Sequence, residues 1–102
     1  SEIFFYFGRK KLERHIQNIK DHYIICGFGR IGSFICDELK KAGQPFVIIE
    51  NNDAVMQEIE NQQYLFVAGN ATQDETLVQA GIRRAKGLVT SVRSDADNLF
   101  IT

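Results

Sequence analysis

One stretch decides the fold of this chain: Tyr23-Ile24-Ile25-Cys26-Gly27-Phe28-Gly29-Arg30-Ile31-Gly32. It joins a short apolar strand to three glycines with the spacing G-x-G-x-x-G. In such a turn the first glycine, Gly27, permits the tight bend, and the second, Gly29, leaves out the Cβ that would block a phosphate. The third, Gly32, lets the following helix pack closely on its strand, with its N-terminus facing the anion. The stretch therefore predicts a strand–turn–helix unit that binds a nucleotide.

The residues after this turn alternate between helical and strand patterns. Helical patterns cover 30–42, 53–61 and 73–80, and apolar strand patterns cover 23–26, 46–50, 64–68 and 87–92. This alternation predicts right-handed βαβ units and an α/β, Rossmann-like fold, with helices on both faces of a parallel sheet of strand order 3-2-1-4. The periodicity of the first helix places Ile31, Phe34, Ile35 and Leu39 on its inner face.

Both ends of the chain carry further helical patterns. Residues 1–20 predict a basic N-terminal linker helix, in which an aromatic run at 4–7 precedes a stripe formed by Leu12, Ile16 and Ile19. A helical pattern that begins at Asp97 is cut after about one turn. We therefore expect the domain at 21–102 to be truncated after its fourth strand, and the open sheet edge to find a partner.

The composition describes one small globular domain. The 102 residues are 44% hydrophobic and 25% charged, with a net charge of -1. A nearly neutral chain gives no reason to expect a nucleic acid partner, and no apolar run approaches the roughly 20 residues that span a bilayer. Cys26 and Cys36 lack a C-x-x-C spacing, so we expect small buried hydrophobes in a cytoplasmic protein.

An acidic residue, Glu50, ends the second predicted strand about 20 residues after the glycine turn. A carboxylate there can accept both hydroxyls of an adenosine ribose, and it repels a 2′-phosphate. The sequence thus favours NAD(H) or an adenine nucleotide (AMP, ADP or ATP) over NADP(H). A solvated acid at a strand end is the alternative interpretation.

Three further residues are candidates for nucleotide contact. Arg30 begins the phosphate-facing helix, where a guanidinium can bind phosphate oxygens bidentately, or it is an ordinary exposed arginine. Asn51 either flanks the ribose or belongs to a turn. Thr90 ends the fourth strand, where its backbone or hydroxyl can reach the cleft.

Four segments together resemble a known family, the RCK domain, also called the TrkA-N domain. They are Asp21–Gly32, Glu50, the turn Gly69-Asn70-Ala71-Thr72, and Ala80-Gly81-Ile82-Arg83-Arg84-Ala85. The likeness covers about residues 21–102. Ordinary dehydrogenases share the glycines and the acid, but rarely the G-[DN]-A-T turn followed by A-G-I-x-x-A. Residues 1–20 are similar to the linker between the inner pore helix of a channel and its first RCK domain.

The resemblance implies a non-enzymatic, ligand-sensing domain on the cytoplasmic face of the membrane, which couples a nucleotide to gating of a potassium channel pore. Such domains form homodimers that assemble into rings. Asn70, Ala71 and Thr72 lie where the family's third loop covers the adenine, although Asn70 replaces the more usual aspartate. The predicted nucleotide-binding residues are Gly27, Phe28, Gly29, Arg30, Ile31, Gly32, Glu50, Asn51, Asn70, Ala71, Thr72 and Thr90.

Other functions stay open. A peripheral regulatory subunit of a Trk/Ktr-type potassium transporter would begin close to the first strand, without the basic extension. The cofactor half of an NAD-dependent dehydrogenase would need a catalytic His, Lys or Tyr constellation, and none is recognisable, so we predict no catalytic residue. Glu75, Asp95 and Asp97 offer oxygen ligands for a cation, but Asp97 is more simply a helix-capping acid. We therefore predict no metal site.

Overall fold

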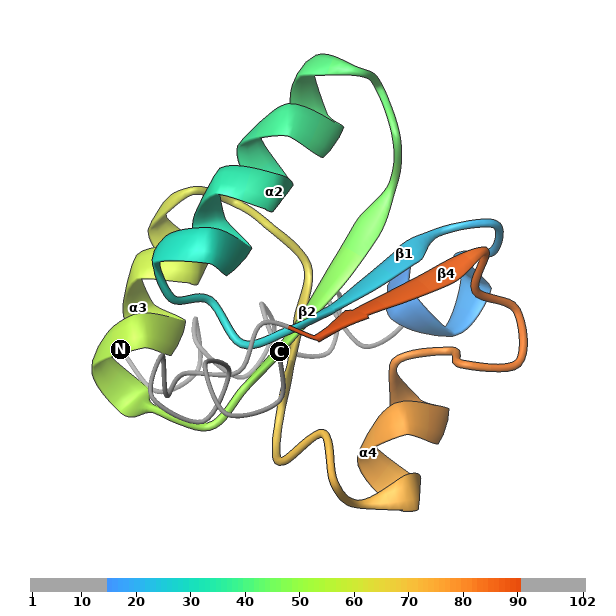
Figure 1. Ribbon diagram of the computed structural model, residues 1–102. Helices are drawn as coiled ribbons and strands as arrows, with labels where there is room; N and C mark the ends of the chain where they lie inside the picture. The colour runs from blue at the N-terminus through green and yellow to red at the C-terminus, as the bar shows by residue number, and fades with distance from the viewer. Residues whose placement is uncertain (1–14, 91–102) are drawn as a thin grey trace, which may run out of the picture.

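The computed structural model describes residues 15–90 and contains a four-stranded sheet of order β3-β2-β1-β4 (Figure 1). The strands are β1 (Tyr23–Cys26), β2 (Phe46–Glu50), β3 (Phe66–Ala68) and β4 (Gly87–Thr90), and the helices are α2 (Arg30–Lys41), α3 (Asp53–Asn61) and α4 (Asp74–Gln79). Every strand pair is parallel. The predicted fold class and strand order are confirmed.

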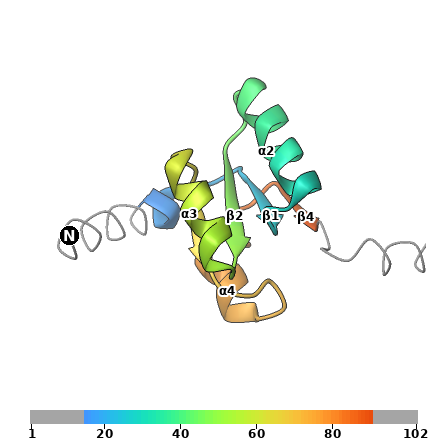
Figure 2. The same cartoon turned by 90° about the vertical axis from the view of Figure 1, so that its left-hand side faces the viewer.

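The sheet has a covered face on each side. Figures 1 and 2 show α2 and α4 on opposite sides of the sheet. The α2 and α3 side buries Ile25, Phe28, Cys36, Phe46, Ile48, Ile59 and Phe66. The α4 side, which also carries a short N-terminal helical turn (residues 15–18), buries Ile16, Ile24, Val47, Ile49, Val67 and Ala80. Since both faces are covered, all five residues of β2 are buried.

The inner face of α2 differs from its prediction. Ile35 and Leu39 pack against the core as expected, but the side chains of Ile31 and Phe34 are 50% and 63% exposed. Gly32 and Cys36, one turn apart, are the fully covered residues of this helix. These two small residues set the rotation of the helix on the sheet, and they turn Ile31 and Phe34 outward.

The third strand begins later than predicted, at Phe66 rather than residue 64. Gln63 has a left-handed backbone (φ 64°), and the N–H groups of Gln63 and Tyr64 donate to carbonyls of α3. These two residues close the helix and cannot pair with β2 at the same time.

Residues 1–14, positions 91–92 of the fourth predicted strand and the helix expected near Asp97 lie outside the described residues. Between residues 15 and 90, no helix has the length and apolar character needed to span a bilayer.

Cys26 and Cys36 do not form a disulfide with each other. Cys36 lies fully inside the core under α2, and Cys26 is half-buried at the end of β1. Burial raises the pKa of the Cys36 thiol to about 12, and it also raises the pKa of Cys26. Both side chains therefore behave as small apolar groups.

The free energy of unfolding should depend strongly on buried apolar residues and only weakly on exposed ones. Ile59 is fully buried between α3 and the sheet, so Ile59→Ala should lower the free energy of unfolding by about 2–5 kcal/mol. Phe34→Ser should change it by less than about 0.5 kcal/mol, because Phe34 is mostly exposed. Urea denaturation at low protein concentration measures both values. A loss of several kcal/mol for Phe34→Ser would mean that α2 sits on the sheet in the predicted orientation instead.

Stability should also fall at alkaline pH because of Cys36. The unfolded thiol loses its proton near pH 9, whereas the folded thiol keeps it until about pH 12. Unfolding is therefore favoured increasingly above pH 9, by about 1.4 kcal/mol at pH 10. The drop in unfolding free energy between pH 7 and pH 10 should be smaller by this amount in Cys36→Ala. An identical drop in unfolding free energy in both proteins would contradict the assignment of this pH dependence to the Cys36 thiol.

Candidate functional site

The three glycines of the turn have distinct positions. Gly27 adopts a left-handed backbone (φ 95°), and its N–H donates to the carbonyl of Ile49 at 2.8 Å. A Cβ built on Gly29 would meet no atom within 4 Å, so the protein itself leaves the space in front of this residue open. Gly32 is buried against the sheet. These positions fit the bend, the phosphate approach and the close packing predicted from the spacing.

The N-terminus of α2 lacks any acceptor supplied by its own first turn. Its cap residue is Gly29, which has no side chain, and no acidic residue follows in the first turn. By contrast, α3 is capped by Asn52, whose side chain accepts from the N–H of Val55 at 3.0 Å, and α4 begins with Asp74 and Glu75. Among α2, α3 and α4, only α2 has a positive end with no capping side chain or first-turn acid, which leaves this end available to an anion.

Glu50 lies beside the glycine turn with its carboxylate engaged by backbone N–H groups. Oε1 accepts from Phe28 at 2.9 Å, while Oε2 accepts from Asn51 at 3.1 Å and from Asn52 at 3.0 Å. The residue is only 6% exposed. A carboxylate offers about four acceptor positions, so one remains. Glu50 thus ties the glycine turn to the turn between β2 and α3.

The other predicted residues of the turn separate into two groups. Phe28 buries its side chain in the core, with an edge contact to Tyr64 at 6.2 Å between ring centroids. Ile31 points outward from α2. Arg30 is exposed at the first position of the helix. Of these three side chains, those of Ile31 and Arg30 are exposed at the start of α2, and only that of Arg30 can donate hydrogen bonds to a ligand.

The loop after β3 is held by Asn70. Its Oδ1 accepts from the N–H and from the hydroxyl of Thr72, both at 2.9 Å. This is the Asx-turn geometry that an aspartate also forms, so the amide preserves the shape of the loop. Gly69 lies so close to α4 that a Cβ there would come within 2.8 Å of Thr76 Oγ1.

Parallel pairing collects these segments at one edge of the sheet. Cys26, just before the glycine turn, pairs with Ile49 on one side and Thr90 on the other. Glu50 pairs with Ala68, just before the third loop. The backbones of all the predicted nucleotide-binding residues therefore lie at or near the carboxyl ends of the strands, as in a dinucleotide-binding fold.

Asn52 also belongs to this edge of the sheet, although no role was predicted for it. Its N–H binds Glu50, and its side chain caps α3. The only sequence signal was its position before Asp53 at a helix start, which is the pattern of a capping residue.

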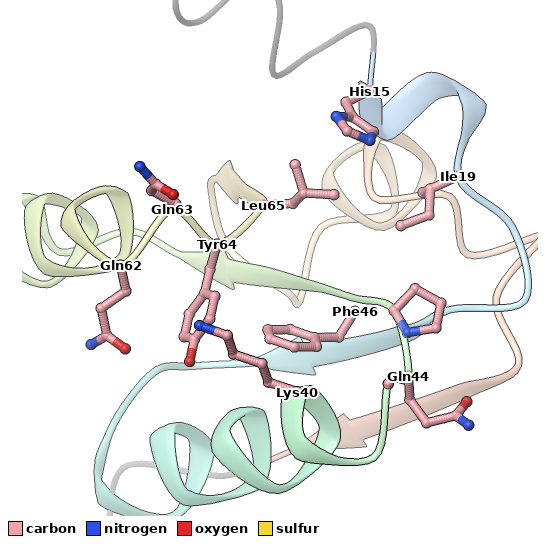
Figure 3. A pocket seen from close by; sticks show the side chains of 11 residues that line it. His15, Ile19, Lys40, Gln44, Phe46, Gln62, Gln63, Tyr64 and Leu65 are labelled. Carbon is pink, nitrogen blue, oxygen red and sulfur yellow. The ribbon is translucent and has the colours of Figure 1, made fainter.

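A hollow of about 490 Å³ lies at the opposite edge, where β2 and β3 begin (Figure 3). It is lined by His15, Ile19, Lys40, Gly43, Gln44, Pro45, Phe46, Gln62, Gln63, Tyr64 and Leu65. Lys40 Nζ lies 5.4 Å from the centre of the Tyr64 ring. The hollow is thus separate from the predicted nucleotide site.

Over residues 15–90 no three His, Cys, Asp or Glu side chains gather as metal ligands would; Asp95 and Asp97 are not among these residues.

The family is decided by a match of residues 23–102 to the TrkA-N domain. The chain belongs to the TrkA-N domain family. It is 42% identical to potassium channel protein 1 of Methanocaldococcus jannaschii, over 95% of this chain and 30% of that protein. The chain therefore spans less than a third of this relative.

Two solved structures resemble the fold. The TrkA-N domain of the inner membrane protein YbaL from Escherichia coli has a TM-score of 0.70 and 29% identity, over 74% of this chain and 56% of that one. GsuK bound to ADP has a TM-score of 0.56 and 32% identity, over 89% of this chain and 24% of that one. The predicted family resemblance is confirmed.

The anchoring role of Glu50 can be tested by removing one acceptor oxygen. In Glu50→Gln an amide NH₂ must face at least one of the three backbone N–H groups, so the unfolding free energy should fall by about 1–3 kcal/mol. Glu58→Gln, on the exposed side of α3, should change it by less than about 0.5 kcal/mol. Chemical denaturation measures both. Equal unfolding free energies of the two variants would contradict the role of Glu50 in holding the glycine turn.

Proposed function

We propose that this chain is the ligand-sensing regulatory domain of a potassium channel, placed on the cytoplasmic face of the membrane. It binds NAD(H) or an adenine nucleotide at the glycine turn and catalyses no reaction. The observation that carries the proposal is the open space at Gly29, in front of the uncapped N-terminus of α2 and beside Glu50.

The phosphates bind at the N-terminus of α2. The first-turn N–H groups point toward the ligand, and the helix dipole favours negative charge there. Arg30 is exposed at the same position, and its planar guanidinium matches two phosphate oxygens. Because the turn is already fixed by Glu50, little conformational entropy is lost on binding.

The ribose and the adenine bind along the edge of the sheet. One ribose hydroxyl donates to the remaining acceptor position of Glu50, with Asn51 at its flank. The loop of Asn70, Ala71 and Thr72 covers the adenine, and Thr90 borders it from β4. A 2′-phosphate would bring a second negative charge to the buried carboxylate, so NADP(H) should bind more weakly than NAD(H).

The channel context is supported by the segment before the first strand. The match to the Methanocaldococcus jannaschii potassium channel protein covers 95% of the 102 residues. Only about five residues lie outside it, so it includes most of residues 1–20. A peripheral transporter subunit would not need this extension, whereas a channel needs a linker to its pore.

Regulation requires an assembly with two conformations. In this proposal the domains form homodimers that join into a ring, and the nucleotide binds one conformation of the ring more tightly than the other. A nucleotide of equal affinity for both would shift nothing.

Calorimetry with AMP, ADP, ATP, NAD and NADP tests the nucleotide site. Gly29→Ala should lower the unfolding free energy by about 1 kcal/mol at most, because the new methyl meets no protein atom and alanine is only a poorer N-cap than glycine, yet it should weaken ADP binding at least about tenfold by filling the phosphate space. Arg30→Ala should weaken ADP binding, while Arg83→Ala, another exposed arginine, should not. Unchanged ADP affinity in Gly29→Ala would refute the site, and NADP binding as tight as NAD would refute the role of Glu50.

A further inference from the structure

The segment Ala80–Ala85 makes contacts that the nucleotide site does not use. The Arg84 side chain crosses to the N-terminal helical turn, where Nε–H donates to the carbonyl of Ile19 at 2.9 Å and Nη2 donates to that of Ile16 at 3.2 Å. Its own carbonyl accepts from the N–H of Asp21 at 2.8 Å. Arg84 therefore places a cation on the carbonyl end of this helical turn, where it is stabilising.

A second contact runs in the opposite direction, through His22. Its fully buried ring directs Nε2 at the carbonyl of Ala80, 2.8 Å away, at the end of α4. Since a carbonyl only accepts, Nε2 carries the proton. The backbone carbonyl of His22 accepts from the N–H of Lys86 at 2.7 Å. The side chain of His22 thus caps the end of α4, while the side chain of Arg84 caps the end of the N-terminal helical turn.

These two contacts form a reciprocal clamp, made by His22 on Ala80 and by Arg84 on Ile16 and Ile19. Gly81, at its centre, has a left-handed backbone (φ 80°). A Cβ on Gly81 would lie 2.9 Å from Arg84 Nη2 and 3.0 Å from His22 Cε1. A side chain at Gly81 would therefore press on both halves of the clamp.

The helix α4 connects this clamp to the third loop of the nucleotide site. At its start, Gln73 N–H donates to the carbonyl of Asn70 at 3.0 Å, and buried Thr76 lies against Gly69. At its end, Ala80 N–H donates to the carbonyl of Thr76 at 3.0 Å. A helix of six residues is about 9 Å long, so α4 joins the loop and the clamp directly. In Figure 1, the chain after α4 runs past the N-terminal helical turn before it enters β4.

We infer that α4 and the reciprocal clamp transmit the effect of nucleotide binding from the loop at 69–72 to residues 15–20. A nucleotide that repositions the loop shifts α4 as a body, and the shift reaches the N-terminal segment through Arg84 and His22. The identity of the ligand rests on the proposed function, whereas the mechanical connection rests on the contacts above.

Hydrogen–deuterium exchange at residues 15–20 measures this effect, with ADP as the probe and calorimetry as a parallel assay. Arg84→Ala should speed exchange of this segment about tenfold and abolish its response to ADP, while ADP affinity changes by less than about threefold. Arg84→Lys, which keeps the charge but not the two-pronged contact, should lose most of the response. Arg83→Ala removes the same charge one residue earlier and should keep the full response.

A double-mutant cycle tests the connection without any ligand. Asn70→Ala loosens the loop and should alter exchange at 15–20 when Arg84 is present, but not in the Arg84→Ala background. An equal effect in both backgrounds, or an ADP response that survives in folded Arg84→Ala and Arg84→Lys, would overturn the inference. If ADP fails to bind while the cycle shows coupling, the proposed function is wrong and the clamp stands.

Discussion

The carboxylate of Glu50 is the constraint on which this edge of the molecule depends. A buried charge is costly unless it is hydrogen-bonded, and here three backbone N–H groups from two separate turns satisfy it. The glycine turn and the start of α3 are therefore fixed relative to each other before any ligand arrives. This fixed geometry keeps the N-terminus of α2 pointed at open space, which an unsupported glycine-rich loop would not do.

The architecture was predictable because its signals are local. β2 is a continuous apolar run, and the glycine spacing determines where β1 ends and α2 begins. The orientation of α2 was not predictable, since Ile31 and Phe34 fit the same helical period as Ile35 and Leu39. The choice between these sets depended on how closely Gly32 and Cys36 approach the sheet, and only tertiary packing decides that distance.

The geometry of the candidate site was predictable to a similar depth. The backbone roles of Gly27, Gly29 and Gly32 follow from the turn itself, and Glu50 was located by its strand end. Its engagement with three N–H groups could not be read from the sequence, because these bonds depend on how two turns meet in space. The A-G-I-x-x-A segment was recognised as a family feature without a mechanical role. The acceptors of Arg84 are backbone carbonyls, one of them 68 residues away, and no side-chain pattern identifies a carbonyl as a partner.

The nature of these acceptors has an evolutionary consequence. Every residue carries a carbonyl, so Arg84 recognises the helical shape of the N-terminal segment rather than its side chains. Beyond that shape, the core requires apolar groups only at Ile16 and Ile19. Positions 15, 17 and 20 can therefore diverge without loosening the attachment. A domain built in this way can be joined to many different upstream sequences while its own interior stays unchanged.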